Sequence, residues 1–331
     1  MSNDGISSFH SLSTFIGWYI GLIARSPITM TNLKHILASR PFYKYSSPDT
    51  AIEILRSRNV RYSSPQCFND PFDIQAGLHF DFDIATLHEK VIDRIGELAS
   101  ASEEPAVSND DPWGKIVLAA RQNYPTQGFP RERWRELSGP AFGTLVDVLR
   151  DAQRRYQEHW RSTLLPGIRV FCVSEERDNL LMWAHYAKDH TGCVFEFWAL
   201  PDEDNPLSVA APVEYVEFPI PFFTEREWID NLVSIKKLDH GALYRRYAYA
   251  KSSCWSYEKE WRVWYPLSAS AGNYDDMPIR PTELKAIYVG CRATTDFANE
   301  VVRLASEFFP RANLFRAVKH DTHYSLQYHE M

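Results

Sequence analysis

Two glutamates lie two positions apart in the segment 256–265, which reads Ser-Tyr-Glu-Lys-Glu-Trp-Arg-Val-Trp-Tyr. If this segment is a β-strand, alternation places Glu258, Glu260 and Arg262 on one face and mostly apolar side chains on the other. The two carboxylates then lie about 6.5–7 Å apart, so each affects the charge of the other and both can bind one ligand. The alternative is a solvated strand face, in which a Glu260–Arg262 ion pair adds roughly 0–1 kcal/mol to stability.

Aromatic and polar side chains are also concentrated in the segment 178–192. Its residues predict a short helix with a capping residue before it and a glycine after it. Within this helix, His185 and Tyr186 are candidates for a base and a stacking ring at the edge of a pocket; in the alternative, both are packed structural residues. Residue types and order also allow Cys172 as a nucleophile with His185 as its base, although a cysteine within a strand usually belongs to the core.

The segment 68–73, Phe-Asn-Asp-Pro-Phe-Asp, predicts a turn, because a residue before proline avoids the helical region and aspartate can hydrogen-bond to its own backbone. Its aspartates, Asp70 and Asp73, could bind a divalent metal together with Glu258 and Glu260, since carboxylate oxygens suit Mg²⁺ and Ca²⁺. Turn formation alone is the alternative interpretation of these aspartates.

The strands and helices that would position these residues mix irregularly along the chain. Strands are predicted over 42–45, 60–63, 168–174, 193–198, 213–218, 254–265 and 286–290, and helices over 49–58, 180–189, 228–237 and 296–309. A largely helical insertion is predicted over about 84–165, with an amphipathic stripe between 142 and 160. This irregular order predicts an α+β fold rather than a doubly wound parallel sheet.

The composition of the 331 residues limits the classes of protein to consider. Hydrophobic residues make up 44% and charged residues 24% of the chain, as in a globular protein with a sizeable core. The formal net charge of −7 leaves no overall basic field, so nucleic acid is not the expected partner. The chain also lacks a P-loop, a dinucleotide-binding Gly-x-Gly-x-x-Gly, His-Glu-x-x-His and Gly-x-Ser-x-Gly, which argues against the enzyme classes that those motifs mark.

Cysteine usage and the N-terminal segment bear on location. The five cysteines are scattered and form no Cys-x-x-Cys pair, which is typical of a reducing compartment. The apolar stretch 15–24 is about half the length of a membrane-spanning helix, and no basic residue precedes it as in a secretory signal. We therefore expect a cytoplasmic protein without a membrane partner. We further expect a single α+β domain over 30–331, with 1–29 as a tail or an over-extended translation start.

Six short blocks, taken together and in order, resemble a bacterial family of proteins of unknown function, DUF2971. The blocks are 43–45 (Tyr-Lys-Tyr), 62–65 (Tyr-Ser-Ser-Pro), 68–73 (Phe-Asn-Asp-Pro-Phe-Asp), 172–174 (Cys-Val-Ser), 182–187 (Met-Trp-Ala-His-Tyr-Ala) and 257–262 (Tyr-Glu-Lys-Glu-Trp-Arg). The resemblance spans about residues 42–290, apart from the helical insertion.

The order of these blocks is also similar to that of ADP-ribosyltransferases. This second resemblance implies a split, mixed β-sheet core that binds NAD as a substrate. It also implies an arginine or histidine on an early strand, a Ser-Thr-Ser or aromatic element in the middle, and a glutamate on a late strand. The present sequence has Lys44 or Tyr45 in place of the arginine or histidine, and it offers Ser174 at a strand end instead of Ser-Thr-Ser.

The resemblance to ADP-ribosyltransferases implies roles for individual residues. The catalytic residues would be Glu260, Glu258 and His185, with Glu260 stabilising the oxocarbenium-like ribose that forms as nicotinamide leaves. The NAD-binding residues would be Tyr43, Lys44, Tyr45, Tyr62, Asn69, Asp70, Ser174 and Tyr186. Among them, Tyr186 or Tyr62 would stack on nicotinamide.

The sequence thus leaves three functions open. The first is an NAD-dependent ADP-ribosyltransferase, such as a toxin or antiviral effector in defence, which takes NAD or another nucleotide and an unidentified acceptor macromolecule. The second is a non-catalytic ligand-sensing or interaction domain. The third is a metal-dependent hydrolase or nuclease built on the four carboxylates of the segments described above.

Overall fold

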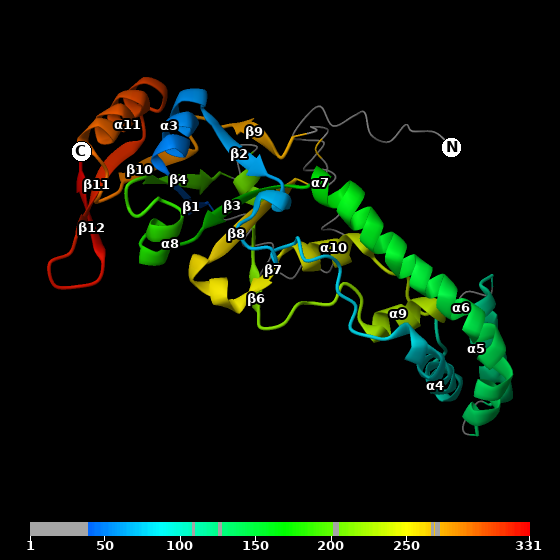
Figure 1. Ribbon diagram of the computed structural model, residues 1–331. Coiled ribbons are helices and arrows are strands. Elements are labelled where there is room, and N and C mark those ends of the chain that lie inside the picture. The colour runs from blue at the N-terminus through cyan, green and yellow to red at the C-terminus, as the bar shows by residue number, and fades with distance from the viewer. Residues whose placement is uncertain (1–38, 108–109, 125–127, 201–204, 266–267, 269–271) are drawn as a thin grey trace. The chain divides into compact units, whose positions relative to one another are not determined.

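The computed structural model describes residues 39–107, 110–124, 128–200, 205–265, 268 and 272–331, and the expected tail at 1–29 lies outside these described residues. Strands and helices mix in an α+β fold, as predicted (Figure 1). The chain forms two compact units. Among the described residues, unit 1 comprises those within 39–75, 164–218 and 249–331, and unit 2 comprises those within 76–163 and 219–248.

Unit 1 contains a mostly antiparallel sheet. Its strands are β1 (Arg40–Ser46), β2 (Asn59–Ser63), β3 (Arg169–Ser174), β4 (Cys193–Ala199), β5 (Ala211–Pro212), β8 (Glu260–Tyr265), β9 (Tyr274–Pro278), β10 (Leu284–Val289), β11 (Asn313–Lys319) and β12 (Leu326–Glu330). The order is β12-β11-β10-β4-β1-β3-β2-β9, with β8 paired to β3 and β5 to β8. The strands β10 and β11 run parallel to each other. Two further strands, β6 (Glu214–Val216) and β7 (Ala250–Ser252), form a separate parallel pair.

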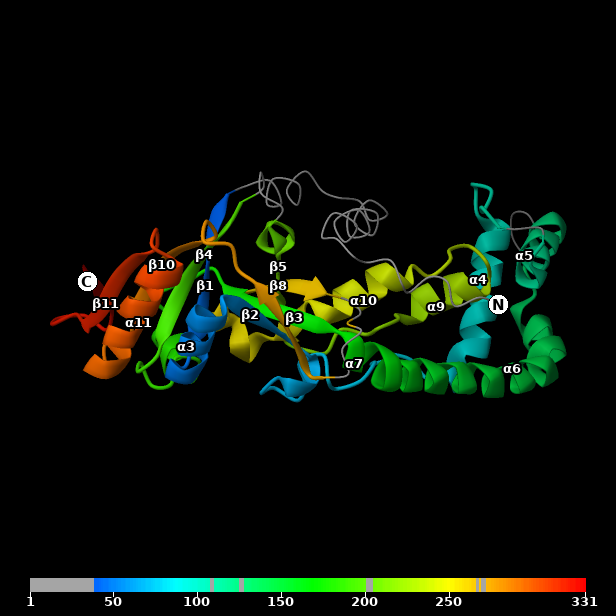
Figure 2. The ribbon, with the colours of Figure 1, turned by 90° about the horizontal axis from the view of Figure 1, so that it is seen from above.

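The sheet changes partners between β1 and β3. Strand β1 pairs with β4 along its whole length, whereas among the described residues it meets β3 only where Tyr43 lies opposite Ser174. Strand β3 pairs along its own length with β8 and ends with Ser174 opposite Glu260. The two halves of the sheet, whose strands are labelled in Figure 2, are therefore joined where the middle of β1 meets the end of β3.

One face of this sheet carries the main hydrophobic core of unit 1. Helices α3 (Pro48–Ser57) and α11 (Thr295–Phe308) lie side by side on this face (Figure 1). The side chain of Ser47 caps the start of α3. Trp261 and Val263 of β8 belong to this core, so Glu260 and Arg262 lie on the other face of the strand, as alternation predicts.

The short helix α8 (Leu180–His185) packs on a second, smaller core in which Trp183 is fully buried. The sequence predicts this helix to extend to residue 189, but residues 188–190 all have positive φ, which ends the helix early. The chain then enters β4 through Gly192. A Cβ atom added there would lie 2.0 Å from the carbonyl oxygen of Ser46, so this close approach requires glycine.

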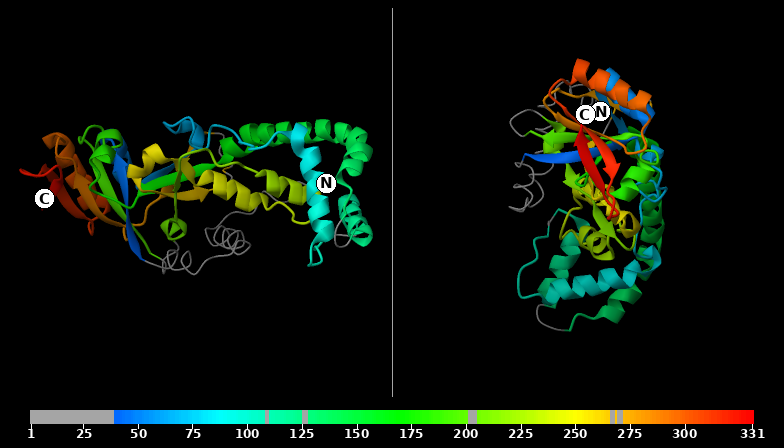
Figure 3. Two further views of the ribbon diagram at one scale, coloured as in Figure 1. Left: turned by 90° about the horizontal axis from the view of Figure 1, so that it is seen from below. Right: turned by 90° about the vertical axis from the view of Figure 1, so that its left-hand side faces the viewer.

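Unit 2 is helical. Its helices are α4 (Leu87–Ser100), α5 (Pro112–Asn123), α6 (Arg131–His159), α9 (Glu225–Leu232) and α10 (His240–Ala248). The first three, coloured cyan to green, lie together in Figure 3. The segment predicted as a helical insertion is therefore helical, and residues 225–248 add two helices to the same unit. Within the part of the chain that the structure describes, we find no helix that is both long and apolar enough to cross a membrane.

Short helical turns complete the two units. They are 3₁₀ turns at Pro65–Cys67, Ile84–Thr86, Pro206–Val209 and Ser253–Glu258, a π-helical turn at Trp160–Leu164, and α7 (Leu165–Gly167). The 3₁₀ turn at Ser253–Glu258 corrects the sequence prediction of a strand over 254–265, because β8 begins only at Glu260.

Candidate functional site

A cavity of about 430 Å³ opens in unit 1 beside the position where β1 meets β3. It is lined by Tyr43, Lys44, Tyr45, Arg61, Ser63, Cys67, Phe68, Asn69, Asp73, Val170, Cys172, Val173, Ser174, Met182, His185, Tyr186, Lys251, Glu258 and Glu260. Nine of the eleven site residues proposed from the sequence are among them. The volume lies within the range that is usual for small-molecule sites.

The two glutamates reach this cavity by a local structure that differs from the predicted strand. Glu258 ends the 3₁₀ turn, Lys259 adopts the left-handed conformation with φ of 46°, and Glu260 begins β8. The hydroxyl of Ser174 donates a hydrogen bond of 2.7 Å to the Glu258 carbonyl oxygen. The single left-handed residue therefore turns both carboxylates toward the same wall of the cavity.

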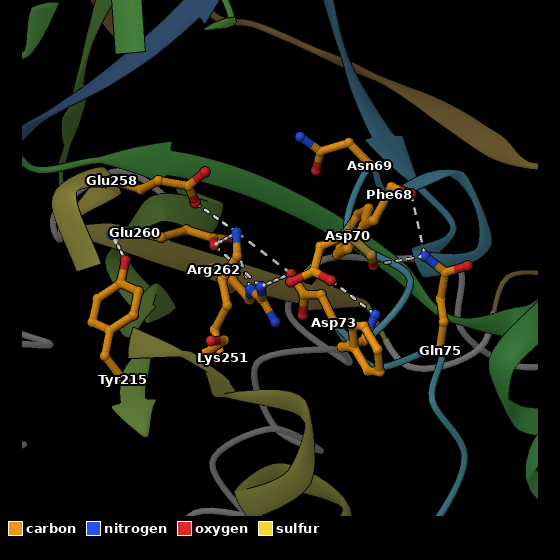
Figure 4. A network of polar contacts seen from close by, with 12 residues as sticks. Phe68, Asn69, Asp70, Asp73, Gln75, Tyr215, Lys251, Glu258, Glu260 and Arg262 are labelled. Atoms are coloured by element: carbon orange, nitrogen blue, oxygen red, sulfur yellow. Dashed lines mark hydrogen bonds and ion pairs between the residues drawn. The ribbon is translucent and has the colours of Figure 1, made fainter. Parts of the chain in front are cut away.

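Five buried charged residues form one network at this wall (Figure 4). The ammonium of Lys251 lies 2.5 Å from Glu258 Oε2, 2.9 Å from Glu260 Oε2 and 3.5 Å from Asp73 Oδ2. Arg262 lies behind them, with Nη2 2.6 Å from Asp73 Oδ2 and Nε 2.7 Å from Glu260 Oε1. All five side chains are at most 6% exposed. Buried charges are tolerated when they are paired in this way.

The two glutamates have opposite protonation tendencies. Burial alone would raise the pKa of Glu260, but the charge of Arg262 and then that of Lys251 outweigh burial and hold this pKa far below its ordinary value. Burial raises the pKa of Glu258 above its ordinary value, against the attraction of Lys251. Burial likewise raises the pKa of Asp73, against the attraction of Arg262. Glu260 is thus the fixed anion of the network, and Glu258 and Asp73 take up protons before it.

Tyr186 and His185 both reach the cavity from the end of α8. The Tyr186 hydroxyl donates a hydrogen bond of 2.5 Å to Glu258 Oε1 and accepts one of 3.3 Å from the side-chain amide of Asn69. Burial and then the hydrogen bond to Glu258 raise the pKa of Tyr186 well above its ordinary value, so the phenol stays protonated. The exposed imidazole of His185 lies with its ring centre 6.2 Å from that of Tyr257.

The early strand β1 contributes a lysine and two tyrosines to the cavity. The ammonium of Lys44 donates a hydrogen bond of 2.9 Å to the carbonyl oxygen of Cys172 on β3, bridging the two halves of the sheet. Among the described residues, no carboxylate forms an ion pair with this half-buried lysine. The hydroxyl of Tyr45 donates to the Glu176 carbonyl oxygen, so its ring is fixed at the cavity wall.

Residues 182–263 match the family model described as a protein of unknown function, DUF2971. This match confirms the family resemblance drawn from the sequence blocks. The matched DUF2971 segment includes Tyr186, Lys251, both glutamates and Arg262, so it contains one wall of the cavity, while β1 lies outside it. No curated protein and no solved structure matches the chain.

Two of the residues proposed to bind NAD, Tyr62 and Asp70, are not among the residues that line the cavity. The ring of Tyr62 is 4% exposed and stacks on Phe171 in the main core, with ring centres 5.1 Å apart, so it has no free face for nicotinamide. Asp70 is buried in its turn, where Oδ1 accepts a hydrogen bond of 2.9 Å from the backbone N–H of Phe72. The structure thus assigns Tyr62 to packing and Asp70 to the turn.

The geometry does not favour the metal-site and cysteine hypotheses. The ammonium of Lys251 lies among Asp73, Glu258 and Glu260, where a metal ion would have to bind. Within the described ranges, no group of three or more acidic, histidine or cysteine side chains is arranged to hold a metal ion. Burial and then the charge of Glu260 raise the pKa of Cys172 well above its ordinary value, which keeps this thiol from acting as a thiolate nucleophile.

Sequence reasoning missed Lys251. It lies on the three-residue strand β7, within Ala-Lys-Ser, and no motif marks it. The signal that could have found it is charge balance, because two buried glutamates and one arginine require a further cation nearby. Phe68 and Asp73 of the predicted turn also line the cavity, although the sequence suggested only a metal-binding role for Asp73.

Proposed function

We propose that the cavity of unit 1 binds NAD, and that the protein releases nicotinamide and transfers ADP-ribose to an acceptor. The observation that carries this proposal is a cavity lined by the pair of glutamates and by Lys44 of β1, a lysine that forms no ion pair with a carboxylate in the part of the chain that the structure describes. A role as an effector in defence belongs to the same proposal, because it follows from the resemblance to ADP-ribosyltransferases.

The glutamates supply the charge that this reaction needs. As the glycosidic bond to nicotinamide breaks, positive charge develops on the ribose, and a preorganised anion in a site shielded from water stabilises it. Glu260 supplies this anion, since Arg262 and Lys251 keep its carboxylate ionised. In the proposal it acts through the electric field at the cavity wall.

Glu258 is better placed than Glu260 to accept a hydrogen bond from a ribose hydroxyl. A carboxylate offers about four lone-pair positions. Those of Glu260 already face Arg262 Nε, Arg262 Nη2, Lys251 Nζ and the thiol of Cys172. Glu258 accepts from Tyr186 and from Lys251, which leaves positions for a ligand. The role of the glutamate that contacts the ribose therefore moves, in this proposal, from Glu260 to Glu258.

The other end of the ligand would lie along β1. Lys44 keeps two of its three N–H groups beyond the one that it donates to Cys172, and these suit an oxygen of the pyrophosphate. The rings of Phe68 and Tyr186, which line the same cavity, would provide faces on which nicotinamide stacks.

The test is to incubate the full chain with NAD and to measure free nicotinamide by chromatography, together with NAD binding by calorimetry. We expect release by the wild-type protein, a decrease of about 10²–10³-fold in Glu258→Gln, and no change in Glu53→Gln, which alters an exposed glutamate of α3. NAD that binds without release of nicotinamide would favour the ligand-sensing alternative. Absence of both binding and release would overturn the assignment of NAD to this cavity.

A further inference from the structure

Unit 2 contains a second cavity, of about 230 Å³, which is lined by α4, α5 and α6 and is partly open to solvent. Its walls are three branched aliphatic residues of α4, Trp113 and Ile116 of α5, and Trp134, Ser138 and Phe142 of α6. Four of the lining residues, Trp113, Ile116, Trp134 and Ser138, are half-buried, so a ligand can enter this cavity from solvent. Binding of an apolar molecule there would be favourable, because it removes the apolar walls from water.

Water is a poor occupant of this cavity. Apart from the indole N–H groups of Trp113 and Trp134, the only polar group on the described lining side chains is the hydroxyl of Ser138. The hydroxyl of Ser138 donates a hydrogen bond of 2.5 Å to the Trp134 carbonyl oxygen and lies 2.8 Å from Nε2 of His88. Its hydrogen bonds are thus made within the protein. A buried water needs two to four polar partners, and cavities with apolar walls stay dry and bind apolar molecules.

The size and walls of the cavity indicate the class of ligand. An apolar cavity of about 150 Å³ holds benzene, so about 230 Å³ leaves room for a second fused ring. The aromatic rings of Trp113, Trp134 and Phe142 offer faces and edges to a planar molecule. No charged side chain is among the described lining residues, so an ionised ligand would be buried there without a counter-ion.

We propose that this cavity of unit 2 is a binding site for a small, neutral, planar aromatic molecule of the size of indole or naphthalene. The site differs from the proposed NAD site, because its lining residues that the structure describes all belong to unit 2. It gives the helical insertion a function of its own, as the part of the chain that binds a small apolar metabolite.

The test uses indole and naphthalene as neutral bicyclic probes and decanoate as an acyl-chain probe, with the full chain. Thermal unfolding is followed as each probe is added, and equilibrium dialysis measures the bound probe. We expect a saturable rise in Tm and saturable binding with the bicyclic probes. Ile116→Phe, which fills the cavity from α5, should weaken their Kd by at least about tenfold. Leu118→Phe is the matched control, because Leu118 is a half-buried residue of the same helix that does not line the cavity.

Each outcome of this experiment is decisive. Loss of binding in Ile116→Phe with retention in Leu118→Phe supports the site. If Ile116→Phe does not fold, as judged by circular dichroism, Ile92→Phe fills the same cavity from α4. Absence of saturable binding by both bicyclic probes, equal binding by the wild type and a folded filled variant, or tighter binding of decanoate than of indole would overturn the proposal.

Discussion

The ammonium of Lys251 lies 2.5 Å from Glu258 Oε2, although the two residues belong to different elements, the strand β7 and the following 3₁₀ turn. This contact connects a residue that no motif marks to the pair of glutamates that the sequence singles out. It also explains how two buried carboxylates lie side by side, since the same ammonium contacts Glu260 at 2.9 Å.

Replacement of Lys251 by methionine should strongly destabilise unit 1. The change leaves Asp73, Glu258 and Glu260 around a single cation, Arg262, and removal of one partner from a buried ion network costs about 3–5 kcal/mol of unfolding free energy. Urea denaturation at neutral pH measures the loss. Lys90→Met is the control, because Lys90 pairs with Glu225 at the surface, and its loss should cost at most about 1 kcal/mol. Equal losses in the two variants would contradict a structural role for the buried network.

The two glutamates should contribute to stability with opposite pH dependence. The pKa of Glu258 is raised in the folded state, so the stability difference between wild type and Glu258→Gln should fall as pH rises from about 4, the unfolded value, through the folded value. The pKa of Glu260 is lowered in the folded state. The stability difference between wild type and Glu260→Gln should therefore be fully present above about pH 4, the unfolded value, and should be lost as pH falls below it. Unfolding free energies of the three proteins between pH 3 and 8 measure both trends. If the stability differences of the two variants depended on pH in the same way, Lys251 and Arg262 would not shift the pKa values of Glu258 and Glu260 in opposite directions.

Substitution of Trp183 should mainly lower the stability of the protein, whereas substitution of Tyr186 should mainly weaken ligand binding. Trp183 is fully buried, and its indole N–H donates a hydrogen bond of 3.0 Å to the Arg177 carbonyl oxygen, so Trp183→Ala should cost about 3–5 kcal/mol. Tyr186 lies at the cavity, so Tyr186→Ala should lower Tm less and should weaken ligand binding. Thermal unfolding and NAD calorimetry on both variants provide the comparison. An equal loss of stability from the two changes would indicate that Tyr186 is a core residue.

Lys44→Met should weaken the binding of NAD while leaving the fold intact. A hydrogen bond to a charged group contributes about 1.5–3 kcal/mol, so the Kd should rise about 10- to 100-fold. Lys285→Met is the matched control, because Lys285 is a half-buried strand lysine that does not line the cavity. Calorimetry with NAD on the three proteins measures the effect. An unchanged Kd in Lys44→Met would remove Lys44 from the proposed pyrophosphate site.

Strand periodicity was sufficient to predict part of the candidate site. Alternation along β8 places Glu260 and Arg262 opposite the core residues Trp261 and Val263, because successive side chains of any strand lie on opposite faces. The same rule placed Glu258 on the strand, where it does not lie. Its position depends on the left-handed Lys259, a backbone choice that the types of neighbouring residues do not signal.

Local sequence therefore determined the α+β class, the helical insertion, the turn at 68–73 and the polar face of β8, since each depends on residues close together in the chain. Tertiary structure alone decided which of these features meet. It placed Lys251 between carboxylates from two segments, Tyr62 in the core, and Lys44 across the single position that joins β1 to β3. Such contacts depend on packing and charge balance between residues that are far apart in the chain; Asp73 and Arg262, for example, are 189 positions apart. The pattern of neighbouring residues therefore does not indicate these contacts.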